Sequence, residues 1–167
     1  MYAADYAVPT PAMMGAAIAD MGTAYGDAAA RVAPDTVELG SGIVNGYTLP
    51  GGLHKWSSSV SFTDSLTFDA GSNFDTVWIL QIAGDLNLGT GARVTLINGA
   101  RASNIFWQIA GQANIPAGAH AEGVILCKTA IIFGAGGSLN GRGLAQTAVT
   151  MIATTIVAPP STPAAVA

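Results

Sequence analysis

The sequence predicts a mostly β fold, a parallel β-helix with one long α-helix packed alongside, from two internal repeats. The segment that begins Gly123-Val-Ile-Leu returns as the segment that begins Gly141-Arg-Gly-Leu, at a sequence offset of 18 (141 − 123 = 18). Gln81-Ile-Ala-Gly returns as Gln108-Ile-Ala-Gly at an offset of 27 (108 − 81 = 27), which equals one such period plus an insertion. Short, β-branched, glycine-punctuated segments that recur at a fixed period are typical of solenoids. A period of 18 fits three short strands and three corners in each coil.

The α-helix is predicted for residues 11–31, and Pro34 ends it. Apolar residues recur there at intervals of three and four: Met14, Ile18, Met21, Tyr25 and Ala28. This spacing places them on one stripe of a helix. The runs Val77–Ile82 and Ile105–Ile109 are almost entirely apolar, which is typical of strands covered on both sides. We therefore expect the helix stripe to pack on these two strands.

Composition limits both the architecture and the function. The 167 residues fit one domain, expected at 1–158, with a proline-rich, linker-like tail at 159–167. Net charge is −4 with no basic run, which argues against a nucleic-acid partner. The sequence has no apolar run long enough for a membrane span and no N-terminal secretory signal pattern. The only cysteine, Cys127, has no partner for an internal disulfide and is expected to be a buried core residue.

One strand of each coil carries an unusual outer surface. With offsets of 18 and 27, two columns of apolar residues point inward: Leu86, Ala113, Ile131 and Val149, then Leu88, Ile115, Phe133 and Met151. The alternating residues point outward: Asp85, Asn87, Gln112, Asn114, Ala130, Ile132, Ala148 and Thr150, with Ser65 and Thr67 expected one coil further. These side chains are short and include one charge. Because coils stack about 4.7–4.9 Å apart, the face predicts a rigid grid that can order water.

The chain resembles the microbial β-solenoid ice-binding (antifreeze) proteins, through motifs that span residues 1–158 in order. The motifs include Tyr2-Ala-Ala-Asp-Tyr-Ala-Val-Pro-Thr-Pro-Ala-Met, Thr48-Leu-Pro-Gly-Gly-Leu-His-Lys-Trp, Ile97-Asn-Gly-Ala-Arg-Ala-Ser-Asn-Ile-Phe-Trp-Gln and Ser138-Leu-Asn-Gly-Arg-Gly-Leu-Ala. The resemblance implies a discontinuous right-handed β-helix that binds ice through one flat face, and a secreted or cell-surface protein. Some members mark that face with Thr-Ala/Gly-x-Thr/Asn. Thr147-Ala148-Val149-Thr150 fits this pattern, and Thr129-Ala130-Ile131-Ile132 fits it except at Ile132.

The chain departs from the family pattern before its helix. Family members carry several strands there, which complete the solenoid beside the C-terminal coil, and this sequence starts at the helix entry. We expect that the chain is a fragment or that another chain supplies the missing coils. Either way, the open solenoid end is expected to self-associate or to be covered by an N-terminal segment.

The alternative to ice binding is a structural or adhesion β-solenoid, and an enzyme is not expected. Polysaccharide lyases need clustered acidic or basic groups, whereas the ten acidic residues are scattered here. His54, expected in a turn, and His120, expected at a corner near Glu122, lack the spacing of a catalytic triad or a metal site. No catalytic residue, metal or cofactor is therefore predicted. Other polar residues receive structural roles: Gln81 and Gln108 as a side-chain ladder, Asn98 and Asn140 at corners, and Arg93, His120, Glu122 and Asn140 on a neighbouring, more charged face.

Overall fold

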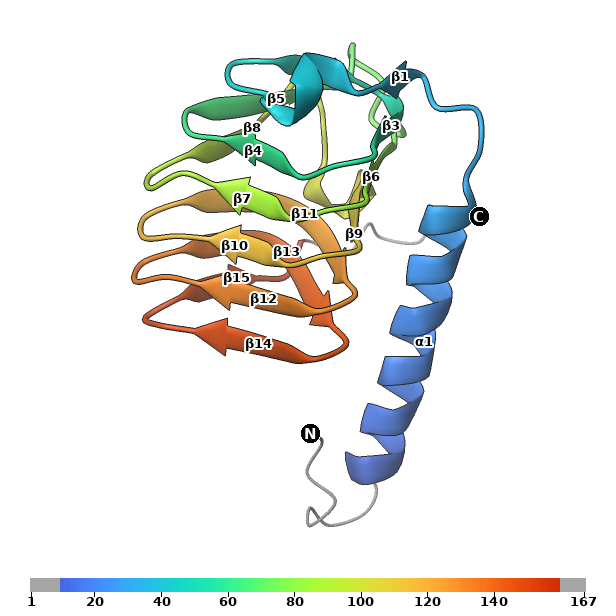
Figure 1. The fold of residues 1–167 in the computed structure, drawn as a ribbon, viewed down its shortest axis with the longest axis vertical. Helices are drawn as coiled ribbons and strands as arrows, with labels where there is room; N and C mark the ends of the chain where they lie inside the picture. Colours follow the sequence, from blue (N-terminus) through green and yellow to red (C-terminus); the bar gives the residue numbers. More distant parts are fainter. Residues whose placement is uncertain (1–9, 160–167) are drawn as a thin grey trace, which may run out of the picture.

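The computed structural model describes residues 10–159. Within them one α-helix and two short 3-10 helices accompany fifteen strands (Figure 1). The helices are α1 (Thr10–Ala30), η1 (Leu39–Gly42) and η2 (Ala102–Asn104). The strands are β1 (Thr36–Val37), β2 (Thr48–Pro50), β3 (Gly52–Trp56), β4 (Val60–Phe62), β5 (Ser65–Asp69), β6 (Trp78–Ile82), β7 (Leu86–Leu88), β8 (Arg93–Ile97), β9 (Ile105–Ile109), β10 (Ala113–Ile115), β11 (His120–Cys127), β12 (Ala130–Phe133), β13 (Ser138–Ala145), β14 (Ala148–Met151) and β15 (Thr155–Val157).

The strands pair in parallel and stack into a β-helix with three faces, as predicted. The helix face consists of β1, β3, β6, β9 and the second halves of β11 and β13. The five-strand face consists of β4, β7, β10, β12 and β14. The third face consists of β2, β5, β8, the first halves of β11 and β13, and β15. Both sequence repeats are confirmed as register pairs, because Gly123 pairs with Gly141 and Gln81 with Gln108.

Glycine makes the bend that carries β11 from the third face to the helix face. Gly123 has φ +112°, and a Cβ there would lie 2.8 Å from the carbonyl oxygen of Ile105. Any other residue would therefore combine an unfavourable dihedral with a backbone clash. Gly141 makes the same bend one coil later, against the backbone of Gly123.

Aromatic side chains fill the first coils of the solenoid. Phe68 lies edge-on between Trp78 and Trp107, with ring centroids 5.6 and 5.7 Å away. All three side chains are buried, and each indole N–H donates to a backbone carbonyl, at Leu49 for Trp78 and at Glu122 for Trp107. Burial with satisfied polar groups makes this core rigid, since packed interiors leave side chains few alternative rotamers.

Helix α1 lies against β6, β9 and β11, as the apolar strands predicted (Figure 1). Met21 and Ala28 are buried against Val124 and Leu126, with Tyr25, Ile79, Phe106 and Leu144 packed around them. The predicted stripe is correct for Met21, Tyr25 and Ala28. It is wrong for Ile18, which is exposed. The side chain of Met14 lies outside the described residues, as do the segments 1–9 and 160–167.

The end of α1 is fixed by Gln81, for which the sequence had predicted a different role. The Gln81 side-chain amide donates to the backbone carbonyls of Ala28 at 2.8 Å and Arg31 at 2.9 Å, with that of Ala29 at 3.3 Å. A helix leaves its last carbonyls without intrahelical partners, and Gln81 supplies donors for them. The predicted ladder with Gln108 is therefore wrong: the two residues pair in register, but the Gln81 amide is engaged by the helix.

Candidate functional site

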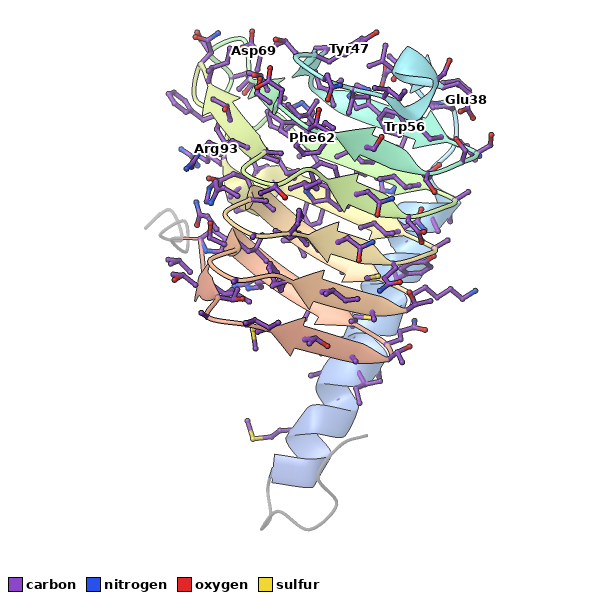
Figure 2. The ribbon with its side chains drawn as sticks, turned by 60° about the vertical axis from the view of Figure 1, so that its left-hand side comes forward. Glu38, Tyr47, Trp56, Phe62, Asp69 and Arg93 are labelled. Carbon is purple, nitrogen blue, oxygen red and sulfur yellow. The ribbon has the colours of Figure 1, made fainter. Side chains whose placement is uncertain are left out.

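The five-strand face presents the outward rows that the sequence predicted for its last four coils. Register pairing places five outward residues in one column: Ser61, Asn87, Asn114, Ile132 and Thr150. Asp85, Gln112, Ala130 and Ala148 lie two residues before the last four of them. The alternate positions point inward, and Leu86, Ile131 and Phe133 are buried. Figure 2 turns toward this side of the molecule, with Phe62 of β4 inside the coil.

Side-chain hydrogen bonds between neighbouring coils fix several polar groups of this face. The Asn114 amide donates to the side-chain oxygen of Asn87 at 2.7 Å. Asp85, the one charged residue in the two rows, accepts from the backbone N–H of Gln112 at 2.7 Å. At the corner before β12, the Thr129 hydroxyl donates to the carbonyl oxygen of Gly111. These groups are held in place by the neighbouring coil, so the polar part of the grid is preorganised.

The face changes character along the stack. Its first three coils present Ser61, Asn87 and Asn114, which offer a hydroxyl and two amides. The next coil presents Ala130 and Ile132, and the last presents Ala148 and Thr150. Thr147 lies at the corner before β14, where its backbone N–H donates to the carbonyl of Thr129. The face therefore joins a hydrogen-bonding half to a mostly methyl-covered half.

Ser65 and Thr67 do not extend these rows, contrary to the prediction. Both lie on β5, which belongs to the third face. Ser61 occupies the expected position instead, because β4 pairs with β7 at a sequence offset of 26 (87 − 61 = 26). Thr67 is one of three threonines, with Thr48 and Thr95, that lie in register on the third face.

The third face carries the longer and more polar side chains. Arg93, on β8, is exposed and lies at the outer side of the stack in Figure 2. His120 bonds through Nδ1 to the Ser138 hydroxyl at 2.8 Å and through Nε2 to Glu122 at 2.9 Å. Glu122 lies on this face as predicted but is buried, and one of its carboxylate oxygens has no hydrogen-bond partner within residues 10–159. Asn140 lies within β13 rather than at a corner, whereas Asn98 has the positive φ expected of one.

Two further titratable residues, His54 and Cys127, are buried in the body of the fold. His54 is buried on β3, not in a turn, and bonds to the Thr36 hydroxyl and the Pro50 carbonyl. Burial lowers the pKa of its imidazole, which favours the neutral form. Burial also raises the pKa of the Cys127 thiol, whose sulfur donates to the Gly111 and Ala130 carbonyls. The described part of the chain contains no cluster of three or more His, Cys, Asp or Glu that could hold a metal.

A family model, described as ice-binding-like, matches residues 1–157. The chain belongs to this ice-binding-like family. A curated ice-binding protein from Colwellia sp. is 47% identical over 165 residues, which is 95% of this chain and 64% of the relative. One from Leucosporidium sp. (strain AY30) is 46% identical over 159 residues, 95% of this chain and 60% of that protein.

Solved structures of ice-binding proteins share the β-helix and the helix beside it. A structure that explains the antifreeze activity of an ice-binding protein from an Arctic yeast is similar with TM-score 0.91 and 45% identity, over 98% of this chain and 69% of that one. The ice-binding protein of Antarctomyces psychrotrophicus gives TM-score 0.85 and 30% identity, over 88% of this chain and 72% of that one. This chain spans less than two thirds of the length of the two curated relatives.

Proposed function

We propose that the chain binds ice and that the five-strand face makes the contact. The observation that carries the proposal is a rigid, register-locked face whose two outward rows contain one charge, in a chain of the ice-binding-like family. Solvent-facing strands usually carry lysine and glutamate, which hold mobile water and project from the surface. Short hydroxyl, amide and methyl groups instead leave a flat surface at the coil spacing of about 4.7–4.9 Å.

The mechanism is adsorption to a crystal surface. Water ordered over the grid joins the growing lattice, and growth then continues only as curved fronts between bound molecules. The curvature lowers the local freezing point and slows recrystallisation. Each contact is weak, so the affinity depends on a surface that loses little conformational freedom on binding. The hydrogen bonds of Asn114, Asp85 and Thr129 remove that freedom before ice is met.

The proposed partner is therefore an ice surface, and the proposed place of action is outside the cell, where ice first forms. No helix in the described part of the chain combines the length and apolarity needed to cross a membrane.

Thermal hysteresis and crystal shape in a nanolitre osmometer test the proposal. Ala130→Tyr and Thr150→Tyr should each remove most of the activity, because a ring projecting from the face prevents flat contact. The matched controls on the third face, Thr67→Tyr and Asn140→Tyr, should keep it. Circular dichroism should show all four variants folded, since the replaced side chains point outward.

Two results would contradict the proposal at different levels. Full hysteresis in both five-strand variants would place the ice contact on another face. A folded wild-type chain that neither shapes ice nor slows recrystallisation would favour a structural or adhesion module instead.

A further inference from the structure

We propose that Asp85 is a positioning residue of the five-strand face. Its side chain lies within the surface, in a recess at Gly111, and fixes the start of β10, so that it acts through the next coil and not through direct contact with ice. The inference rests on the ice contact proposed for this face. A surface that has to be free of projecting groups thereby keeps the one carboxylate of its outward rows.

Asp85 directly precedes β7 and is bonded to the coil on either side. Its backbone N–H donates to the Ser59 hydroxyl at 3.0 Å, and its carbonyl accepts from the Val60 N–H at 2.8 Å, both in the coil before. Its side-chain Oδ1 accepts from the backbone N–H of Gln112 at 2.7 Å, in the coil after. A hydrogen bond to an ionised acceptor is roughly twice as strong as one between neutral groups. The carboxylate is therefore directed along the stack toward the next coil, and the residue is partly buried.

The bond to Gln112 completes the ladder of hydrogen bonds between two coils. The carbonyl of Gln112 accepts from the Leu86 N–H at 2.8 Å, as parallel coils require. Its N–H donates to the Asp85 side chain instead of a backbone carbonyl. Two residues further on, the Asn114 side-chain amide donates to the side chain of Asn87. β10 is thus held to β7 at its start by Asp85 and in its middle by Asn87, and the outward residues of this coil depend on both.

Gly111 leaves the space in which the carboxylate lies. A Cβ at residue 111 would overlap the Oδ1 atom of Asp85. It would also lie 2.7 Å from the carbonyl oxygen of Gly84, because the backbones of the two coils approach closely here. The Gly111 N–H donates to that same carbonyl at 2.9 Å. Residue 111 has no room for a side chain of its own, and the side chain of Asp85 takes that place in the surface.

The corner of the preceding coil has the same arrangement. There Gly84 takes the part of Gly111, and a Cβ at residue 84 would lie 2.5 Å from the hydroxyl oxygen of Ser59. The register of β4 with β7 puts Ser59 in the column of Asp85. In both corners a short polar side chain fills the space beside a glycine of the next coil. Because the recess repeats in consecutive coils, the backbone itself keeps these polar groups down in the surface.

The length of the side chain at residue 85 decides whether its polar group stays in the recess. Glutamate has one more methylene than aspartate, so its carboxylate does not fit the same space and projects from the face. Asparagine has the shape of aspartate and a side-chain oxygen that accepts the same bond without a charge. Alanine stays below the surface but leaves the Gln112 N–H without its acceptor. These three replacements separate a positioning role from direct contact of the charge with ice and from a mere need for a small residue.

Thermal hysteresis of the purified full chain tests the role. Asp85→Glu should lose most of the hysteresis and Asp85→Ala a large part of it, whereas Asp85→Asn should retain clearly more than Asp85→Ala. Asp64→Ala is the matched control and should keep the hysteresis, because Asp64 is an exposed aspartate at the opposite corner of the face whose side chain makes no hydrogen bond within residues 10–159. Circular dichroism at the same temperature should show every variant folded, so that a loss reports ice binding and not unfolding. Amide hydrogen exchange by NMR should be faster at Gln112 in Asp85→Ala than in Asp85→Asn.

The outcomes separate this inference from the proposed function. Wild-type hysteresis in Asp85→Ala or Asp85→Glu, equal losses in Asp85→Asn and Asp85→Ala, or unchanged exchange of the Gln112 amide in Asp85→Ala would each overturn the positioning role. If Ala130→Tyr loses hysteresis while one of these results is found, only the positioning role is wrong. If Ala130→Tyr and Thr150→Tyr keep full hysteresis, or the wild-type chain has none, the proposed function is wrong and the positioning role with it.

Discussion

Replacement of Gln81 by leucine should destabilise the fold by detaching the end of α1 from the β-helix. The Gln81 amide has two N–H groups, and its two shortest bonds, to the carbonyls of Ala28 and Arg31, measure 2.8 and 2.9 Å. Each such bond contributes about 0.5–1.5 kcal/mol net, and a buried carbonyl left unpaired costs about 1–3 kcal/mol. Because Ala28 is buried and Arg31 exposed, we expect a loss of about 2–3 kcal/mol in the free energy of unfolding.

The matched control is Gln108→Leu. Gln108 pairs with Gln81 in register and is similarly buried, but within the described residues it makes no hydrogen bond to α1. Its replacement should therefore cost less than about 1 kcal/mol. Urea denaturation followed by tryptophan fluorescence gives both values, and hydrogen exchange reports whether α1 loses protection. Equal destabilisation in the two variants, or unchanged protection of α1 in Gln81→Leu, would refute the reasoning.

Three further predictions concern stability. Burial lowers the pKa of His54 below the 6.5 expected of the unfolded chain, so the unfolded state binds a proton first as pH falls. The free energy of unfolding should be at its full value above pH 6.5 and decrease below it, and urea titrations at several pH values should find a weaker decrease in His54→Gln. Gly123→Ala should lower the melting temperature because of its φ of +112° and the Ile105 carbonyl. Gly22→Ala, in an open helical position, should raise stability by about 0.5–1 kcal/mol, and a drop in melting temperature there would contradict the argument.

The sequence predicted the last coils more accurately than the first, and the loops explain the difference. From β10 to β14 the chain repeats at a constant offset of 18 without insertion, so inward and outward positions follow from that one offset. Earlier, the loop after β5 lengthens the coil, and the corner between β7 and β8 is longer than the corner between β4 and β5. The interval is 26 from Ser61 to Asn87 but 28 from Ser65 to Arg93 (93 − 65 = 28). The prediction placed Ser65 and Thr67 20 residues before Asp85 and Asn87 (85 − 65 = 20), whereas the true interval in this coil is 26, so it assigned both residues to the wrong face.

Buried polar groups were the other feature that the sequence did not predict correctly. The sequence shows that residues 81 and 122 are glutamine and glutamate, but the groups that these side chains contact belong to distant segments of the chain. The carbonyls that bind Gln81 lie far earlier in the chain, at the end of α1. No local pattern encodes such a pairing, because it depends on where the helix lies against the sheet. Periodicity predicts which side chains face the core, and tertiary contacts decide what the polar ones bind.

The tertiary contacts of polar side chains also explain why the five-strand face suits a crystalline ligand better than the third face. Both faces repeat at the coil spacing, and the third face even has a row of three threonines in register. On the third face, however, that row adjoins the exposed Arg93, a long charged side chain that holds its own water. In the two outward rows of the five-strand face the only charge, Asp85, is tied to the next coil because it accepts a hydrogen bond from the backbone N–H of Gln112. A periodic surface can match a lattice only where nothing projects from it, so the fixing of Asp85 matters as much as the repeat itself.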